Sequence, residues 1–304
     1  MLAKVLRDFF LHVSKNALLN TAAKRWGLKL GAAQVVAGDS IESMVGKVKE
    51  LNQQGLLCTL DHMGEFVTSK EEAINATNQN IKTMETIARE ELNSQLSVKL
   101  TQLGIDFDQE FCKENMLRIL HTAKKYNLFV NIDMEDYEHC QKTFDLLAEL
   151  RKQYDNVGTV IQAYLYRSQE DVKALQGVIL RLVKGAYKES KDVAYQDQES
   201  IDDHFFELIK ARLLSGSYTA IATHDHHIIE KVKVFIKENE IPRDLFEFQM
   251  LYGFRKELQH ELVKEGYQVR VYVPFGNDWF AYYMRRLAER PQNIRFALKG
   301  LFSK

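Results

Sequence analysis

The 304-residue sequence has three prolines, three cysteines and almost no net charge. Its 41 basic and 42 acidic residues lack the basic excess typical of nucleic-acid binding, so a nucleic-acid partner is not expected. Cys58, Cys112 and Cys140 are odd in number and lack metal-ligand spacing, which predicts a cytoplasmic protein without a disulfide framework. No apolar stretch approaches the roughly 18 residues that span a bilayer.

The chain has no Gly-, Ser- or Pro-rich linker, and only its N-terminal segment stands apart. Residues 1–30 carry six Lys and Arg residues against the single acid Asp8, interleaved with apolar residues. This pattern fits a basic amphipathic helix on a membrane surface or helices packed against the body of the protein. Packing is favoured, because an apolar stripe at helical spacing usually faces a core. We predict an N-terminal helical segment over residues 1–50 and a single barrel domain over residues 51–304.

Eight short apolar runs alternate with amphipathic segments along the rest of the chain. Such runs are typical of buried parallel strands, and strands that alternate with helices form βαβ units. No G-x-G-x-x-G follows the first run, so a (β/α)₈ barrel of the TIM type is favoured over an open doubly wound sheet. The predicted strands are Leu56–Leu60, Leu96–Leu100, Leu128–Ile132, Thr159–Leu165, Val178–Val183, Thr219–Thr223, Phe246–Leu251 and Val269–Val273.

Two helix starts carry a capping signal. Ser69-x-x-Glu72 and Ser168-x-x-Asp171 resemble capping boxes, in which a serine hydroxyl accepts a hydrogen bond from the backbone three residues later. Each precedes an amphipathic segment, so both serines are predicted to cap a helix.

In a barrel of this type, chemistry gathers at the C-terminal ends of the strands. Lys99, Asp133 and Arg181 stand at or near such ends. A barrel interior would not hold these charges unless they met partners, because an unpaired buried charge is costly. They form either a purely structural ion-pair cluster or part of a site. Further polar residues at the strand ends are Asp61, His62, Glu135, Gln162, Tyr164, Lys184, Thr223, His224, Asp225, Gln249 and Tyr272.

The run from Arg181 to Tyr187 ends a predicted strand with small residues beside a cation. Gly185 and Ala186 allow a ligand to approach the backbone closely, and Lys184 adds positive charge. These features suit a phosphate or the edge of a planar cofactor, although glycine after a strand is also an ordinary turn residue.

Thr223-His224-Asp225-His226-His227 raises the alternative of a metal site, since imidazole and carboxylate groups bind zinc. His226 and His227 are instead expected to begin the next helix, with side chains about 100° apart around its axis. A metal-dependent hydrolase barrel that uses His224 and Asp225 is therefore the second hypothesis, and a non-catalytic binding barrel is the third.

A helix face near the C-terminus carries Tyr282, Arg285, Arg286 and Glu289 at i, i+3, i+4 and i+7. It is either a solvated outer face or a wall of a polar pocket. Two adjacent guanidinium groups can bind a carboxylate in a bidentate manner, which suggests an amino-acid or organic-acid ligand.

Taken together and in order, these segments resemble the proline dehydrogenase family of flavoenzymes. The resemblance extends from about residue 55 to residue 293, and departs from the expected pattern at Asp225, where Asn is expected, and in a shorter connection from Gly276 to Arg285. The segments that carry it are Ser97-Val98-Lys99-Leu100, Asn131-Ile132-Asp133-Met134-Glu135, Gln162-Ala163-Tyr164, Arg181–Tyr187, Ala222-Thr223-His224, Phe246-Glu247-Phe248-Gln249, Tyr272 and Ala281-Tyr282-x-x-Arg285-Arg286-x-x-Glu289.

The resemblance implies a (β/α)₈ barrel that binds FAD noncovalently. It implies oxidation of L-proline to (S)-1-pyrroline-5-carboxylate by hydride transfer to FAD, with a membrane quinone as the final acceptor. Expected partners are therefore L-proline and a quinone, with a peripheral contact on the inner face of the plasma membrane and coupling to a pyrroline-5-carboxylate dehydrogenase. No metal is expected.

The resemblance also assigns roles to residues. Asp133 and Arg181 become catalytic groups that flank the substrate and the isoalloxazine. The substrate is expected to contact Lys99, Tyr272, Tyr282, Arg285, Arg286 and Glu289. FAD is expected to contact Met134, Gln162, Arg181, Lys184, Gly185, Ala186, Thr223, His224, Gln249 and Leu251.

Overall fold

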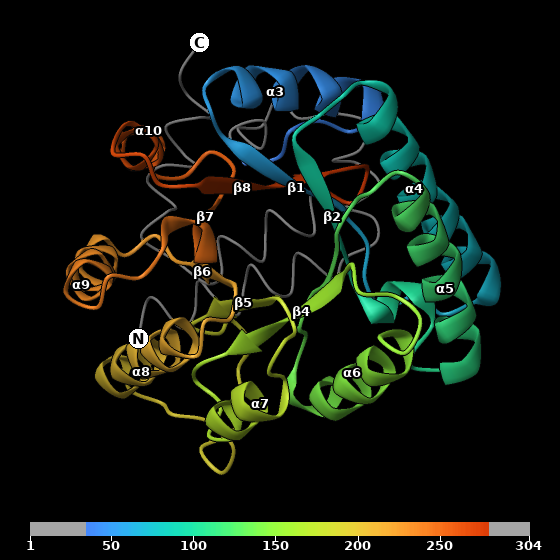
Figure 1. The fold of residues 1–304 in the computed structure, drawn as a ribbon. Helices are drawn as coiled ribbons and strands as arrows, with labels where there is room; N and C mark the ends of the chain where they lie inside the picture. The colour runs from blue at the N-terminus through green and yellow to red at the C-terminus, as the bar shows by residue number, and fades with distance from the viewer. Residues whose placement is uncertain (1–34, 280–304) are drawn as a thin grey trace, which may run out of the picture.

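The computed structural model describes residues 35–279, in which eight parallel strands close into a barrel in sequence order (Figure 1). Each strand pairs with the next, and β8 pairs with β1. The predicted barrel is confirmed, and so are all eight predicted strands; the largest discrepancy is at the end of the fourth, which stops at Gln162. The strands are β1 Leu57–His62, β2 Ser94–Val98, β3 Val130–Ile132, β4 Val157–Gln162, β5 Leu180–Val183, β6 Thr219–Ala222, β7 Phe246–Leu251 and β8 Val269–Phe275.

Helices alternate with the strands and surround the barrel (Figure 1). Among the described helices, none combines the length and the apolar character needed to cross a membrane. They are α3 Ile41–Gln53, α4 Lys70–Arg89, α5 Gln109–Lys125, α6 Tyr137–Leu150, α7 Ser168–Ala174, α8 Gln198–Leu214, α9 His226–Glu238 and α10 Lys256–Lys264, with the 3₁₀ turns η3 Leu100–Leu103 and η4 Arg243–Leu245.

One of the two predicted capping signals is confirmed. Ser69 caps α4, where its hydroxyl accepts from the Glu72 N–H at 3.2 Å. The prediction for Ser168 is wrong: Arg167 occupies the N-cap position, and Ser168 is the first helical residue. The physical reason is an ion pair, because Asp171 accepts from the Arg167 guanidinium at 2.8 Å and the serine hydroxyl donates to a carbonyl of the preceding turn.

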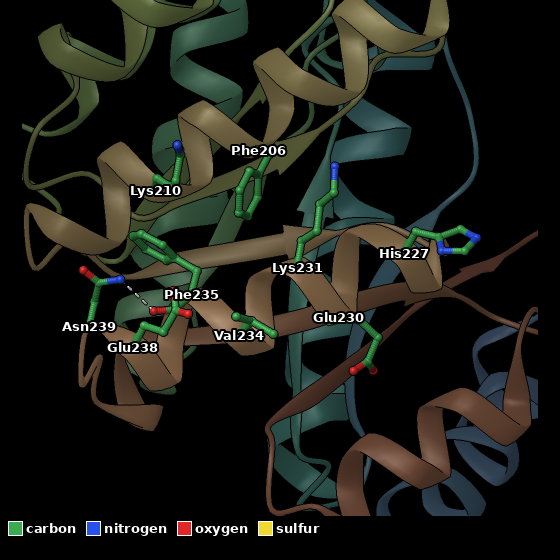
Figure 2. A pocket seen from close by; sticks show the side chains of 9 residues that line it. All are labelled: Phe206, Lys210, His227, Glu230, Lys231, Val234, Phe235, Glu238 and Asn239. Atoms are coloured by element: carbon green, nitrogen blue, oxygen red, sulfur yellow. Dashed lines mark hydrogen bonds between the residues drawn. The ribbon is translucent and has the colours of Figure 1, made fainter.

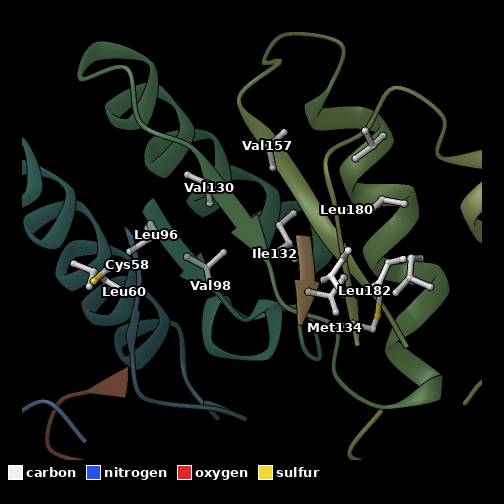
Figure 3. Packing of buried hydrophobic residues seen from close by; sticks show 14 of the residues in the cluster. Cys58, Leu60, Leu96, Val98, Val130, Ile132, Met134, Val157, Leu180 and Leu182 are labelled. Atoms are coloured by element: carbon white, nitrogen blue, oxygen red, sulfur yellow. The ribbon is translucent and has the colours of Figure 1, made fainter. Parts of the chain in front are cut away.

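The main apolar core lies outside the barrel, between the strands and the helices. Alternate strand residues such as Leu96, Ile132 and Leu182 are fully buried there (Figure 3). The helix α3 joins this core through Met44 and Val48. The predicted domain boundary at residue 50 lies within this helix. Because successive strand residues face opposite sides, the residues between these apolar ones face the barrel interior.

Candidate active site in the barrel mouth

Three charged side chains meet inside the barrel at its C-terminal end. Asp133, just beyond β3, binds the Nη1 of Arg181 on β5 through Oδ1 at 2.7 Å. Its Oδ2 binds the Nζ of Lys99, just beyond β2, at 3.2 Å. Since β3 and β5 are not neighbours in the barrel, the first of these bonds crosses its interior. The expectation that these charges find partners is confirmed.

Asp133 is the centre of the cluster. Its Oδ1 also accepts from the Ser97 hydroxyl at 2.5 Å, and its Oδ2 accepts from the Tyr272 phenol at 2.6 Å. Burial on its own would raise the pKa of Asp133, but Lys99, Arg181 and the two hydroxyl donors outweigh it and lower the pKa to about 2. Asp133 is therefore an anion at any physiological pH.

Lys99 connects Asp133 to a second carboxylate. Its Nζ lies 3.3 Å from Asp61 Oδ2 at the end of β1 and 3.4 Å from the Tyr272 phenol oxygen. Burial lowers the pKa of Lys99, but electrostatic interactions with Asp61, Tyr272 and Asp133 more than compensate and raise it well above its ordinary value. Burial, with the neighbouring carboxylates, raises the pKa of Tyr272, so the phenol stays protonated and can donate.

Arg181 supplies the one feature that a purely structural cluster would not need. Its Nε donates to Gln249 Oε1 at 2.7 Å, and its guanidinium carbon lies 5.2 Å from the centre of the Tyr272 ring. Its Nη2 is buried without a hydrogen-bond partner among residues 35–279. A buried donor of this kind costs free energy unless a ligand accepts from it, so the geometry favours a binding site.

Beyond β3, a second carboxylate lies in a different environment. Glu135 is 2% exposed and accepts from the Thr101 hydroxyl at 2.6 Å. Burial raises the pKa of Glu135 to about 7. Gln162, at the end of β4, donates to the backbone carbonyl of Glu135 at 2.7 Å, and this bond joins the segments that follow β3 and β4. Met134, which precedes Glu135, is 7% exposed. Gln162 and Met134 therefore lie at the barrel mouth, and their contact with a cofactor stays a prediction.

The loop after β5 is shaped by its glycine. Gly185 has φ +118°, and a Cβ on it would lie 2.2 Å from the ring of Tyr164. Glycine is therefore required here for two reasons: the positive φ angle, and the contact with the Tyr164 ring, which leaves no room for a Cβ atom. Lys184 is held by Asp202 at 2.6 Å and by Asp225 at 2.8 Å, and Ala186 is exposed. Tyr164 places a buried hydroxyl, unpaired within the described chain, beneath this loop.

The residues of the metal alternative have other partners. His224 accepts the Leu251 N–H at Nε2 over 2.9 Å, and Asp225 caps α9 by accepting from the His227 N–H at 3.0 Å. Thr223, 6% exposed, accepts from the Asp225 N–H at 3.1 Å. No group of three or more metal-ligating side chains is found between residues 35 and 279, so the hydrolase hypothesis has no support.

The expected divergence of the two following histidines is wrong. His226 and His227 do begin α9, as predicted, but their ring centres lie only 3.9 Å apart. Neighbouring residues at the start of a helix can bring their rings together through side-chain rotation, which the 100° rule for Cα positions does not describe.

The comparisons with known proteins agree with this geometry. A family model described as "Proline dehydrogenase" matches residues 44–297. The chain is 50% identical over 302 residues to "Proline dehydrogenase 2" of Bacillus subtilis (strain 168), covering 99% of this chain and 100% of the relative. The chain belongs to the proline dehydrogenase family. It is also 38% identical to "Proline dehydrogenase" of Deinococcus radiodurans, over 99% of each chain.

Among solved structures, the barrel is similar to proline utilization A from Bdellovibrio bacteriovorus, described as inactivated by N-propargylglycine. The TM-score is 0.80 at 26% identity, over 90% of this chain. The match spans about a third (34%) of that longer protein, so only the shared barrel enters the comparison. Membership of the proline dehydrogenase family makes the protein an oxidoreductase.

Some predicted site residues of this proline dehydrogenase family member lie outside the described part of the chain. These are the helix face Tyr282, Arg285, Arg286 and Glu289, and the basic stretch over residues 1–30. Their roles stay predictions.

Sequence reasoning did not assign Ser97 and Asp61 to the site, although both contact its charged groups. Strand alternation could have found Ser97, because residues 97 and 99 face the same side of the second strand. No pattern indicated that Asp61 would take Lys99 as a partner, since that pairing depends on how neighbouring strands align.

A groove on the outer surface belongs to a different region. It lies between α8 and α9, where Phe206, Val234 and Phe235 are flanked by charged and polar side chains such as Lys210, Glu230 and Lys231 (Figure 2). None of the predicted site residues lines it. The barrel mouth is therefore the candidate active site.

Proposed function

We propose that the protein oxidises L-proline to (S)-1-pyrroline-5-carboxylate with FAD as the bound oxidant. The observation that carries this proposal is the buried Lys99–Asp133–Arg181 cluster in the barrel mouth of a proline dehydrogenase family member, with the Nη2 donor of Arg181 left open. The buried anion Asp133 suits the amino group of an amino acid, and the predicted clamp of Arg285 and Arg286 suits its carboxylate.

Asp133 is the group best suited to act on the ring nitrogen. Oxidation transfers a hydride from the carbon next to nitrogen to the bound oxidant, so positive charge develops on the C=N unit, and the proton on nitrogen is released to solvent water. An aspartate held as an anion by Lys99 and Arg181 stabilises that charge without having to ionise during the reaction. Each oxygen of Asp133 already accepts at least two hydrogen bonds from the protein, so its contribution to the substrate is electrostatic.

Lys99 and Tyr272 hold Asp133 in place from the other side. Both donate toward its Oδ2, at 3.2 and 2.6 Å, and both stay protonated at neutral pH because of their raised pKa values. The Tyr272 ring, packed beneath the Arg181 guanidinium, also offers an apolar surface for the proline ring.

The residues present fit FAD. Arg181 offers a buried cation and an open donor for an electron-rich ring system. At the same mouth Gln162 ends β4, and Thr223 and His224 follow β6. FAD, when bound, supplies the two-electron acceptor that no side chain provides. The chain's own part is to bind, orient and stabilise charge. Lys184, Gly185 and Ala186 would line one edge of the cofactor, and Gln249 and Leu251 another.

The acceptor beyond FAD is proposed to be a membrane quinone. Quinones reside in lipid, so the protein is proposed to touch the inner face of the plasma membrane, with residues 1–30 as the candidate contact. Its imine product would then be consumed by a pyrroline-5-carboxylate dehydrogenase. Sedimentation with anionic liposomes, with and without residues 1–30, tests the contact; unchanged binding after deletion removes these residues as its source.

The decisive experiment is the absorbance spectrum of the purified protein before and after anaerobic addition of L-proline. We expect a yellow protein whose flavin bands bleach with L-proline, and persist with D-proline. A colourless protein, or one whose flavin is not reduced by L-proline, overturns the proposal.

The predicted carboxylate clamp is tested on the same preparation. Arg285→Met and Arg286→Met should each remove charge-assisted bonds of roughly 1.5–3 kcal/mol, which lowers kcat/KM roughly 10- to 150-fold while FAD stays bound. Near wild-type efficiency in both variants would refute the clamp.

A further inference from the structure

A second pair of charges lies deeper in the barrel than the site. Glu247, second residue of β7, is 2% exposed, and its Oε1 accepts from the Nε of Arg270 on β8 at 2.7 Å. Arg270 also donates through Nη1 to the Cys58 carbonyl on β1 at 2.9 Å. The proposed chemistry uses neither residue, yet burying two charges is costly unless their geometry serves a purpose.

Gln249 links this pair to the site. Its Nε2 donates to Glu247 Oε1 at 2.5 Å, and its Oε1 accepts from the Nε of Arg181 at 2.7 Å. A carboxylate can only accept and a guanidinium can only donate. The amide of Gln249 therefore has a single orientation that satisfies both neighbours, with its NH₂ toward Glu247 and its oxygen toward Arg181.

We propose that Glu247 is a positioning residue for the reaction, which fixes the Gln249 amide and through it the Arg181 guanidinium. Gln249 then holds the Nε of Arg181, and Asp133 holds its Nη1. Its Nη2 is the guanidinium nitrogen that has no hydrogen-bond partner among the described residues. Arg270 holds Glu247 in turn. The inference rests on the proposed function, because it assigns Arg181 to the substrate and cofactor.

The way Glu247 shares its bonds distinguishes this role from a plain ion pair. Both donors, from Arg270 and Gln249, meet the same oxygen, Oε1; Oε2 receives a hydrogen bond from neither, and the Tyr218 phenol interacts with the pair. The bidentate arrangement that arginine and carboxylate groups frequently form would use both oxygens. The observed arrangement instead directs one oxygen to Gln249.

Two double variants test the inference. Glu247→Leu with Arg270→Met removes both charges, so no unpaired charge stays buried, and leaves Gln249 without its acceptor. Glu247→Gln with Arg270→Met removes the same charges but keeps an amide oxygen for Gln249. We expect the first variant to lose about 10- to 100-fold in kcat for L-proline, and the second to retain most of it, because misplacing a catalytic group by about 1 Å can cost a factor of 10².

A crystal structure of each variant supplies a readout that does not depend on activity. In the leucine variant the 2.7 Å bond between Arg181 Nη1 and Asp133 Oδ1 should be broken or the guanidinium rotated; in the glutamine variant it should persist. Equal losses of kcat in the two variants with Arg181 unmoved would show a purely structural ion pair and overturn the inference.

The remaining outcomes are also decisive. If the leucine variant does not fold, Gln249→Met, which leaves the Glu247–Arg270 pair intact, should rotate Arg181 in the crystal; an unmoved Arg181 overturns the inference. If the wild-type protein does not oxidise L-proline, the proposed function fails, and the position of Arg181 in the variants still decides whether Glu247 positions it.

Discussion

The inside and the outside of the barrel are built from the same strands but from opposite kinds of residue. On β5, Arg181 faces inward to Asp133 and Gln249, and Leu182 faces outward into the core beneath the helices (Figure 3). Strand alternation puts one residue on each side of the wall. The interior holds the charged network, whereas the outer layer supplies most apolar burial, so activity and stability should respond to different substitutions.

The largest expected effect is on activity. Arg181→Met removes the buried donor from the mouth but leaves Asp133 paired with Lys99, so the fold should persist. Loss of one preorganised donor of this kind costs about 10²–10³-fold in kcat. Steady-state kinetics with L-proline and a thermal melt check this together. A variant with unchanged kcat would place Arg181 outside the machinery.

The adjacent residue should behave in the opposite way. Leu182→Ala removes a fully buried side chain from the outer core and should cost about 2–5 kcal/mol in the free energy of unfolding, without altering the interior bonds. Urea unfolding measures the loss, and kinetics below the melting temperature should give a kcat within about threefold of wild type. A loss of activity as large as that of Arg181→Met would mean that substitutions in the outer core also disturb the interior network.

The outer face also explains how much of the fold could be predicted. Outward residues such as Leu96, Ile132 and Leu182 make each strand an apolar run, so the eight strands could be recognised from sequence. Strand ends were less certain, because Leu165 continues the apolar pattern past Gln162, where β4 ends; it pairs instead with Ala194 in an isolated antiparallel bridge.

The interior was predicted only near the mouth. Lys99, Asp133 and Arg181 could be found because barrel chemistry gathers at C-terminal strand ends. Glu247 and Arg270 stand near the opposite ends of β7 and β8, where the same rule predicts only stability. Their pairing depends on the register of two strands, which a single sequence does not reveal.

A buried cation in the helical layer offers a smaller test. Arg212 on α8 is 1% exposed and has carbonyl partners at Val178 (2.7 Å) and Tyr218 (2.9 Å), just before β5 and β6. Burial lowers the pKa of Arg212 to about 10, so the cost of desolvating the charged guanidinium offsets part of the stabilisation from these hydrogen bonds. Arg212→Met should therefore cost about 1–3 kcal/mol in unfolding free energy, with kcat unchanged. A gain in stability would show that desolvation outweighs the carbonyl bonds.

The smallest expected effect concerns a histidine outside the barrel. His139 on α6 is 7% exposed, with Nδ1 2.5 Å from Asp136 and Nε2 2.7 Å from Asp106 in the preceding β2–α5 connection. Burial lowers the pKa of His139, but the two carboxylates outweigh it and raise the pKa above its ordinary value. The folded state therefore holds the proton more tightly than the unfolded state does.

Linkage then fixes the sign. The contribution of His139 to stability is fully present below its unfolded pKa of about 6.5 and is lost as pH rises through the folded-state pKa. The raised pKa of Glu135, about 7, also lowers the free energy of unfolding as pH rises from about 4.5. Wild type and variant share this effect, so the difference between their stabilities isolates His139. In urea unfolding at pH 5.5 and pH 8.5, His139→Gln should lose stability chiefly at pH 5.5, and Asp106→Asn should show a smaller loss of the same sign. An equal loss at both pH values would mean that the imidazole is held neutral by packing and not charged between its two carboxylates.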